Sequence, residues 1–393
     1  MYLTKEEERI YDGEAGWANQ VCMKILVRLG ELFNATRLIP IESAHVSGVS
    51  YKTIGDAPSE FLEALASSGG KVNVEATLNP QSVDPKYLRK RLPESAIEKQ
   101  LKIVRQFEKM SFTQSLTCTP YYLKKPKRGS HISWAESSAV VYANSILGAW
   151  TNREGGPSAL AAAIIGKTPD YGVHNAENRE PNILVKVEAL LRNETEYGAL
   201  GILLGKILGD KIPIIQDLKN ASKEYLKQLG AALASTGMTN MFYCNYSHVK
   251  TKMKEIQKIS VEAKDIKESI ESLSTAPTPK PDLVFIGCPH CSINEIKQIA
   301  NLIGDRKVKD GTEFWVCTSR FVKEKAKKYV ERIEKSGAHV LTDTCAVVTW
   351  TDRLGIKTLM TNSAKTAHYA PMLNKAETAL APLKECLKTA LKG

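Results

Sequence analysis

The C-terminal part of the chain, residues 282–393, alternates short apolar runs with amphipathic helical segments, and this order strongly constrains the fold. Such alternation predicts a parallel sheet with helices on both faces. Because crossovers between parallel strands are right-handed, the carboxyl ends of these strands are expected to share one edge. The pattern predicts strands at 283–286, 313–316, 339–341 and 356–360, and helices at 293–302 and 321–336.

Residues with reactive side chains follow these predicted strands. The first strand is expected to stop at Gly287, and Ser292 is placed to cap the next helix. In open α/β sheets, ligands bind outside the carboxyl ends of the strands. The predicted edge carries thiols, an imidazole, a hydroxyl and an ammonium group, from Cys288, His290, Cys291, Cys317, Cys345, Ser363 and Lys365.

Four interpretations of these cysteines stay open from the residues alone. Cys288-Pro289-His290-Cys291 supplies half of a structural zinc site, but the sequence has no second C-x2-C pair to complete it. The same motif at a strand–helix turn is typical of thiol–disulfide chemistry, although in much smaller domains. Widely spaced cysteines can instead hold an iron–sulfur cluster. Finally, the thiols can simply fill buried strand ends.

Composition narrows the class of protein. The chain has 393 residues, 43% of them hydrophobic, and a polar N-terminus without an apolar signal segment or a membrane-spanning run, so we expect a cytoplasmic globular protein. The eight cysteines are therefore not expected to form disulfides. The net charge of +11 favours small anionic molecules or an acidic partner. The lysines are spread along many helices rather than clustered with aromatic residues, so nucleic-acid binding is not expected.

The N-terminal half places small polar segments after predicted strands. Residues 43–50 form an expected Ser/Gly turn in which backbone N–H groups can converge on an anion, and residues 78–80 end a strand predicted at 71–77. Glu136 and Ser137 are expected in the first turn of a helix, where backbone N–H groups are unpaired and a carboxylate is favoured in any case.

Domain boundaries follow from composition. Ser274 to Pro281 contains three prolines, which make a stiff and extended linker. We predict an N-terminal α/β lobe at 1–110, a middle lobe at 111–273, a Pro-rich linker at 274–281 and a doubly wound lobe at 282–393.

Many short motifs in one order resemble the aconitase X family over nearly the whole chain. The motifs that carry the resemblance are Gly13-Glu14, Ser43-Ala44-His45-Val46-Ser47-Gly48 with Gly55-Asp56, Thr77-Leu78-Asn79-Pro80, Cys118-Thr119-Pro120-Tyr121, Gly287-Cys288-Pro289-His290, Asp343-Thr344-Cys345, and Thr361-Asn362-Ser363-Ala364-Lys365 with Tyr369-Ala370-Pro371.

The resemblance implies several α/β lobes with largely parallel sheets around a cluster-binding cleft. It implies that Cys118, Cys288 and Cys345 hold a [4Fe-4S] cluster, with [2Fe-2S] as the alternative, and that Cys291 and Cys317 are not ligands. With three thiolates on three irons, the open fourth iron would act as a Lewis acid on a leaving hydroxyl.

The implied reaction is the dehydration of (R)-5-phosphomevalonate to trans-anhydromevalonate 5-phosphate, in archaeal isoprenoid biosynthesis. The resemblance makes Glu136 a candidate proton carrier, with Ser363 as an alternative base in this chain. The implied substrate-binding residues are Gly48, Val49, Ser50, Asn79, Pro80, Glu136, Ser137 and Lys365.

The resemblance also implies a partner, because in aconitase-like enzymes the catalytic serine belongs to a swivelling domain. In this family that domain is usually a small second subunit, so we expect a heteromer. The near alternative is another aconitase X substrate, such as cis-3-hydroxyproline. The distant alternative is a non-catalytic basic protein that binds RNA or zinc.

Overall fold

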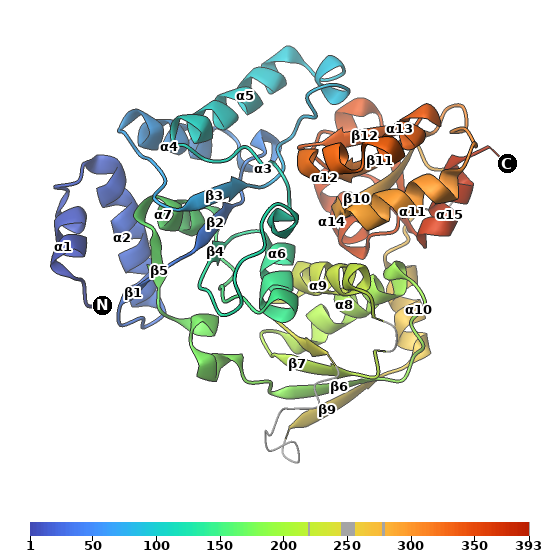
Figure 1. The fold of residues 1–393 in the computed structure, drawn as a ribbon. Helices are drawn as coiled ribbons and strands as arrows, with labels where there is room; N and C mark the ends of the chain where they lie inside the picture. Colours follow the sequence, from blue (N-terminus) through green and yellow to red (C-terminus); the bar gives the residue numbers. More distant parts are fainter. Residues whose placement is uncertain (219–220, 245–255, 277–279, 393) are drawn as a thin grey trace. The chain divides into compact units, whose positions relative to one another are not determined.

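The computed structural model describes residues 1–218, 221–244, 256–276 and 280–392. The chain divides into two compact units, which Figure 1 shows in sequence colours. Unit 1 consists of Met1–Val83 and Pro93–Glu180, and unit 2 consists of Asp84–Leu92 and Pro181–Gly393. The chain therefore passes between the units three times. Residues 277–279 of the predicted linker lie outside the described residues.

Unit 1 is built around a parallel sheet with the strand order β3-β2-β4. Helix α7 is buried along its length, and its alanines let α2 and β2 approach it closely. The elements are α1 (Lys5–Asp12), α2 (Trp17–Leu32), β1 (Leu38–Pro40), β2 (Ser43–Val46), α3 (Tyr51–Ile54), α4 (Asp56–Ser67), β3 (Glu75–Leu78), α5 (Glu94–Lys109), β4 (Ser133–Trp134), α6 (Ser137–Tyr142), a π-helical turn (Ala143–Leu147), α7 (Gly156–Ile165) and β5 (Lys167–Pro169).

Two details of unit 1 differ from the prediction. Residues 43–46 form strand β2, because Ala44, His45 and Val46 are buried in the middle of the sheet, and only residues 47–50 form the loop. The strand predicted at 71–77 begins only at Glu75.

Unit 2 contains two parallel sheets. The first has the order β8-β7-β6-β9, and the second has the order β12-β11-β10-β13-β14. The elements of the first part are β6 (Ile183–Val187), α8 (Glu194–Leu208), β7 (Pro213–Gln216), α9 (Lys223–Thr236), β8 (Tyr243–Cys244), β9 (Gln257–Val261) and α10 (Ala263–Ser272). Those of the second part are β10 (Leu283–Cys291), α11 (Ile293–Ile303), β11 (Glu313–Thr318), α12 (Arg320–Lys325), α13 (Lys327–Lys335), β12 (His339–Thr342), β13 (Thr358–Thr361), α14 (Ala364–Asn374), β14 (Glu377–Leu380) and α15 (Leu383–Ala390).

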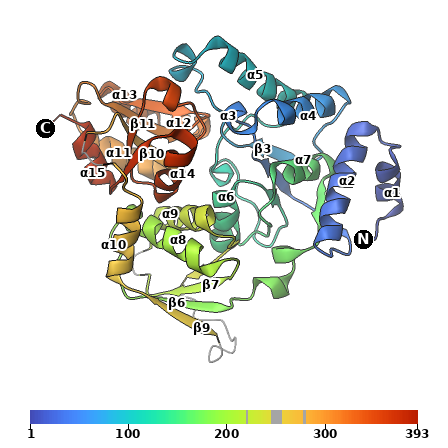
Figure 2. The same ribbon diagram turned by 180° about the vertical axis from the view of Figure 1, so that it is seen from behind.

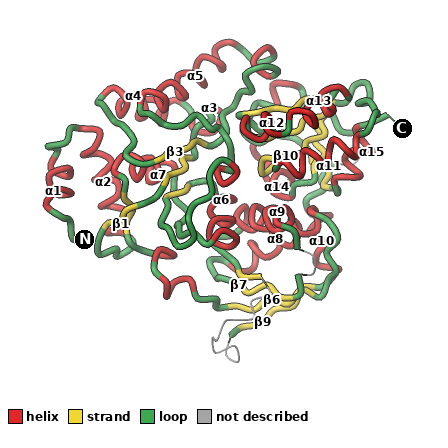
Figure 3. Tube along the Cα trace, viewed as in Figure 1, coloured by secondary structure: helices red, strands yellow, loops and turns green. Residues whose placement is uncertain are grey.

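The five-stranded sheet confirms the predicted parallel arrangement with helices on both faces (Figure 3). Three local predictions were wrong. Strand β10 does not stop at Gly287 but shifts register and continues to Cys291, where it rejoins Thr318 of β11. The helix predicted at 321–336 is interrupted at Ala326. Strand β14 was not predicted.

Helices α8 and α9 lie side by side in both views of the ribbon (Figures 1 and 2). Glycines allow this approach. A Cβ atom on Gly201 would come within 2.7 Å of Ala232 Cβ and 2.9 Å of the Leu233 nitrogen, and it would also overlap the Leu229 carbonyl oxygen. The pair also packs against α14, where Gly198 faces Ala364.

A nine-residue strap, Asp84–Leu92, belongs to unit 2 although unit 1 flanks it on both sides in the sequence. Asp84 Oδ1 accepts hydrogen bonds from the backbone N–H groups of Lys86 and Tyr87, at 3.0 and 2.5 Å. The Tyr87 ring stacks on His339 of the edge strand β12, with 3.7 Å between ring centroids. The strap therefore covers one edge of the five-stranded sheet.

None of the helices in the described ranges is long and apolar enough to cross a membrane.

Candidate functional site

In unit 1, predicted substrate-binding residues follow all three strands of the parallel sheet. Residues 47–50 follow β2, Asn79 and Pro80 follow β3, and Glu136 follows β4 at the N-cap of α6. Because the strands are parallel, these segments share the carboxyl edge of the sheet. The sheet thus brings together residues that lie far apart in the sequence.

Hydrogen bonds join this edge into one chain of side chains. Glu136 Oε1 accepts from the Ser138 hydroxyl at 2.7 Å, and Glu136 Oε2 accepts from Asn79 Nδ2 at 2.8 Å. Asn79 Oδ1 lies 3.2 Å from His45 Nε2, and His45 Nδ1 lies 2.8 Å from Thr77 Oγ1. The N–H of Ser138 also donates to Glu136 Oε1, at 3.3 Å. The Glu136 carboxylate is therefore oriented by two residues, Ser138 and Asn79, and Asn79 is itself fixed by a buried imidazole.

The network also fixes the state of His45. Its imidazole is fully buried, and desolvation lowers its pKa to about 4, against a smaller opposing effect of Glu136. The ring is thus neutral at pH 7. Because Asn79 donates to the carboxylate, its oxygen faces His45, so Nε2 carries the proton and Nδ1 accepts from the Thr77 hydroxyl.

The loop after β2 is held from one side by Gln100, which is fully buried. Gln100 Nε2 donates to the Val49 carbonyl at 2.9 Å, and its oxygen accepts from the N–H of Ser82 at 3.0 Å. Gly48 has φ +80°, which favours glycine. The N–H groups of Gly48 and Val49 donate to no residue of the described ranges, so they are available to an anion.

Cys118 lies on a turn that is attached to the end of β3. The N–H of Thr117 donates to the Leu78 carbonyl at 2.9 Å, and the Ser115 hydroxyl contacts the N–H and carbonyl of the same residue. The Cys118 side chain is buried, with the residue 8% exposed. The predicted cluster cysteine of unit 1 therefore lies on a turn that is hydrogen-bonded to the end of β3, the strand that Asn79 follows.

In unit 2, Cys288 and Cys345 are buried and lie near one another at the carboxyl edge of the five-stranded sheet. Burial raises the pKa of the Cys345 thiol to about 12, and the proximity of Cys288 contributes in the same direction. Hydrogen bonds from the N–H groups of Val348 and Val347 and the charge of Lys365 oppose this rise. Two close thiols, one of which receives N–H donors and lies near an ammonium group, suit a cluster with thiolate ligands.

The two cysteine loops are also joined directly. His290, which is fully buried, contacts the Thr344 carbonyl oxygen through Nε2 at 3.1 Å. Thr344 Oγ1 is buried and has no hydrogen-bonding partner among the residues that the structure describes. Asn362 Oδ1 is likewise buried and has no hydrogen-bonding partner in the described part of the chain, although Asn362 Nδ2 donates to Glu194 Oε1 at 3.1 Å. Such orphaned polar atoms are typical of a site that a bound group completes.

Ser363 and Lys365 lie at the start of α14. Ser363 is fully buried and caps the helix, with its hydroxyl accepting the N–H of Thr366 at 3.2 Å. The structure thus brings Cys288, Cys345 and Lys365 together in unit 2, whereas Cys118 lies in unit 1. No group of three His, Cys, Asp or Glu side chains gathered for a metal ion is found within the described ranges.

A cavity of about 790 Å³ lies beside strand β12 in unit 2, between the strap and α12. Five lysine and arginine residues line it, and three of them are in ion pairs. Arg91 lies 2.8 Å from Glu313, Lys323 lies 2.9 Å from Glu334, and Arg320 pairs with the buried Asp343. These three ion pairs balance much of the positive charge of the cavity.

Two residues that organise the edge of the unit 1 sheet, His45 and Gln100, were not predicted as site residues. His45 belongs to the motif Ser43-Ala44-His45-Val46-Ser47-Gly48, and an imidazole next to a predicted anion-binding turn was a signal. Gln100 lies in the amphipathic helix α5, and no local pattern marks it as buried.

Comparison with known proteins agrees with this geometry. Models of the first, second and third domains of aconitase X match residues 1–177, 181–271 and 281–392. The phosphomevalonate dehydratase large subunit of Methanocaldococcus jannaschii is 48% identical over 99% of this chain and 100% of its own length. The cis-3-hydroxy-L-proline dehydratase of Pseudomonas aeruginosa is 32% identical over 98% of this chain but only 69% of its own length.

A solved structure has the same fold. The holo-form of aconitase X from Thermococcus kodakaraensis is 41% identical, covers 99% of this chain and 100% of its own, and superposes with a TM-score of 0.93. Because all three domain models match in order and the relatives align over nearly the full length, the chain belongs to the aconitase X family.

Proposed function

We propose that this chain is the large subunit of a hydro-lyase that dehydrates (R)-5-phosphomevalonate to trans-anhydromevalonate 5-phosphate. One observation carries this choice of substrate. The chain spans the full length of the Methanocaldococcus jannaschii protein named for phosphomevalonate, at 48% identity, but only 69% of the relatives named for cis-3-hydroxyproline, at 31–32%.

We propose that Cys118, Cys288 and Cys345 hold an iron–sulfur cluster, of the [4Fe-4S] type. The buried thiols, the N–H donors at Cys345 and the nearby ammonium of Lys365 fit such a group. When bound, the cluster supplies a Lewis-acid iron that polarises the leaving hydroxyl.

The residues of unit 1 bind and orient the substrate in this proposal. The N–H groups of Gly48 and Val49, with Ser50 beside them, bind an anionic group, and Asn79 and Pro80 line the same edge of the sheet. Asn79 is oriented by His45 and so presents a fixed amide. Lys365 of unit 2 contributes a positive charge that suits a phosphorylated acid.

Glu136 is our candidate for proton transfer within this chain, with Ser137 beside it at the start of α6. Glu136 is 8% exposed, and its carboxylate accepts hydrogen bonds from Asn79 Nδ2 and from the hydroxyl and the N–H of Ser138, so its position is set before substrate binds. The Ser363 hydroxyl is fully buried and serves as a helix cap, which favours Glu136 over it. We propose that a small swivel-domain subunit closes the site and supplies the base; the name "large subunit" of the relatives supports such a partner.

Co-expression with a candidate small subunit, followed by anaerobic assay on 5-phosphomevalonate and on cis-3-hydroxy-L-proline, tests the proposal. We expect dehydration of the phosphorylated acid only, with iron and acid-labile sulfide in the purified pair. Cys345→Ala should lose iron and turnover together, whereas Cys22→Ala, which removes a thiol buried in helix α2, should keep both. An iron-loaded pair that acts on hydroxyproline instead would overturn the substrate assignment.

A further inference from the structure

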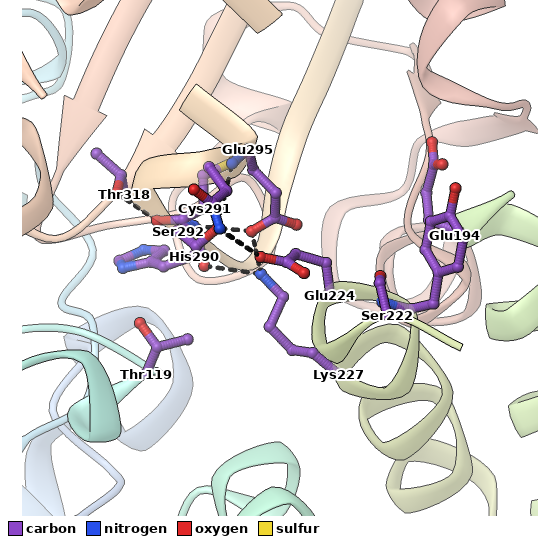
Figure 4. Close-up of polar contacts among 12 residues, drawn as sticks. Thr119, Glu194, Ser222, Glu224, Lys227, His290, Cys291, Ser292, Glu295 and Thr318 are labelled. Atoms are coloured by element: carbon purple, nitrogen blue, oxygen red, sulfur yellow. Dashed lines mark hydrogen bonds and ion pairs between the residues drawn. The ribbon is translucent and has the colours of Figure 1, made fainter. Parts of the chain in front are cut away.

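Helix α9 carries a lysine whose burial the proposed reaction does not explain. The Lys227 side chain is 1% exposed. Figure 4 shows it extending from α9 toward His290 and Glu295, where Nζ lies 2.5 Å from Glu295 Oε2 and 3.2 Å from the His290 carbonyl oxygen. These contacts lie at the junction of β10 and α11, and residues 288–292 of this junction are called the Cys288 turn below. A buried ammonium group is costly unless its partners are well placed, so these contacts define where the lysine must sit.

Its acidic partner also fixes the end of the turn. Glu295 Oε2 accepts the N–H of Ser292 at 2.7 Å, and the Ser292 hydroxyl accepts the N–H of Glu295 at 3.1 Å, which forms the capping box of α11. Glu224, one turn before Lys227 on α9, lies 3.4 Å from Asn294 Nδ2. Helix α9 thus contacts both ends of the segment between residues 290 and 295.

The turn is fixed on its other side as well. The Thr318 hydroxyl donates to the Cys291 carbonyl at 2.7 Å, and the His290 ring contacts the Thr344 carbonyl, next to Cys345. The contacts therefore run without a gap from α9, through the turn, to the second cysteine loop. Helix α9 lies in the second aconitase X domain, whereas both cysteines lie in the third.

We propose that Lys227 is a positioning residue that holds the Cys288 turn in the conformation needed to bind a metal cluster. It acts through the His290 carbonyl and through Glu295, and it makes cluster retention in the third domain depend on the second. The role in cluster binding rests on the function proposed above. The physical reason is preorganisation, since groups that orient metal ligands typically change metal affinity by about 10–100-fold when they are removed.

Two variants separate positioning from simple stability. Lys227→Met removes the ammonium and leaves Glu295, whose side chain is 18% exposed, without its cation. Lys227→Met combined with Glu295→Gln removes both charges, and glutamine keeps the capping box, so we expect the double variant to regain thermal stability. Neither variant restores the contact to the His290 carbonyl. Lys167→Met is the matched control, because it removes the lysine of another ion pair, with Glu7, in unit 1.

The first measurement needs no cluster. Alkylation of metal-free protein with iodoacetamide, followed by mass spectrometry of each cysteine peptide, reports the opening of the turn. We expect Cys288, which is 5% exposed, to react about tenfold faster in both Lys227 variants, with Cys118 unchanged as an internal reference. Equal Cys288 rates in the wild type and the double variant would overturn the proposal.

The second measurement uses the anaerobically purified complex. We expect iron to leave toward a chelator about tenfold faster from the double variant, at an unfolding temperature close to that of the wild type. Lys167→Met leaves the buried Glu7 without its cation, so it should lose stability but keep the wild-type rate of iron release. Iron retention that recovers together with stability would show that the pair contributes stability only, and would refute the positioning role. A wild-type complex without iron would contradict the proposed function, while the alkylation comparison would still decide the inference.

Discussion

Substitution of Gly201 by alanine tests the close packing of α8 against α9, the helix that carries Lys227. In an unhindered helix interior this change stabilises by about 1 kcal/mol, because alanine has the higher helix propensity. Here the new methyl group would meet Ala232 Cβ at 2.7 Å and the Leu233 nitrogen at 2.9 Å. Both distances are roughly 0.6–0.8 Å shorter than the closest comfortable separation of about 3.5 Å.

The net change in the free energy of unfolding is the helix-propensity gain minus the cost of overpacking. Overpacking of a tight interior costs about 1–3 kcal/mol, and the upper value applies because two of the three obstacles, at Leu229 and Leu233, are backbone atoms of α9 that cannot rotate away. Subtracting the propensity gain leaves a loss of about 2 kcal/mol in the free energy of unfolding. For a unit of this size that lowers the unfolding temperature by about 4–8 °C.

Thermal and urea unfolding followed by circular dichroism measure the loss, with Gly30→Ala as the control. Gly30 lies inside helix α2 of unit 1, and the nearest obstacle is the flexible Met1 side chain. We expect Gly30→Ala to be neutral or stabilising by up to about 1 kcal/mol. If Gly201→Ala were as stable as the wild type, the close approach of α8 and α9 would be refuted.

Two titratable residues give further predictions. Burial raises the pKa of the Glu154 carboxyl above its usual 4.5, so the stability that the protonated form contributes to unit 1 is complete below pH 4.5 and is lost as the pH rises. Glu154→Gln should therefore raise the unfolding temperature at pH 7–8 but not at pH 4. A larger gain at pH 4 than at pH 7–8 would contradict the raised pKa. Because burial lowers the pKa of His45 from 6.5 to about 4, the neutral ring stabilises unit 1 above pH 6.5, and this contribution, about 3 kcal/mol, is lost as pH falls to 4. In His45→Gln the fall in stability over this interval should be correspondingly smaller, as measured by urea unfolding, and an unchanged slope would refute the neutral, buried imidazole.

Much of unit 2 could be predicted because its signals are local. Apolar runs such as Leu283–Ile286 and the N-cap Ser292 lie within a few residues of the features that they predict. Parallel topology then brings Cys288 and Cys345 to one edge by general rules of chain connection. The break of the predicted helix at Ala326 has no comparable signal, since neither glycine nor proline marks it.

The organisation of the sites could not be predicted in the same way. His45 contacts Asn79 and, through it, Glu136, and these residues are separated by 34 and 57 positions. Their pairing depends on the register of three strands, which no single segment specifies. Lys227 is a more instructive case, because a lysine in an amphipathic helix is normally solvated, and only its tertiary environment shows that it is buried.

The strap Asp84–Leu92 has a consequence for the order in which the protein can be assembled during synthesis. Asp84 is hydrogen-bonded to the N–H of Thr342, a residue 258 positions further along the chain. The ribosome therefore releases the strap long before β12, the strand edge that it covers, has been made. Expression of residues 181–393 alone would leave that edge of the C-terminal sheet bare, and unpaired strand edges promote aggregation. The strap, which interrupts unit 1 in the sequence, can therefore reach its final contacts only after residues 339–342 of β12 have been synthesised.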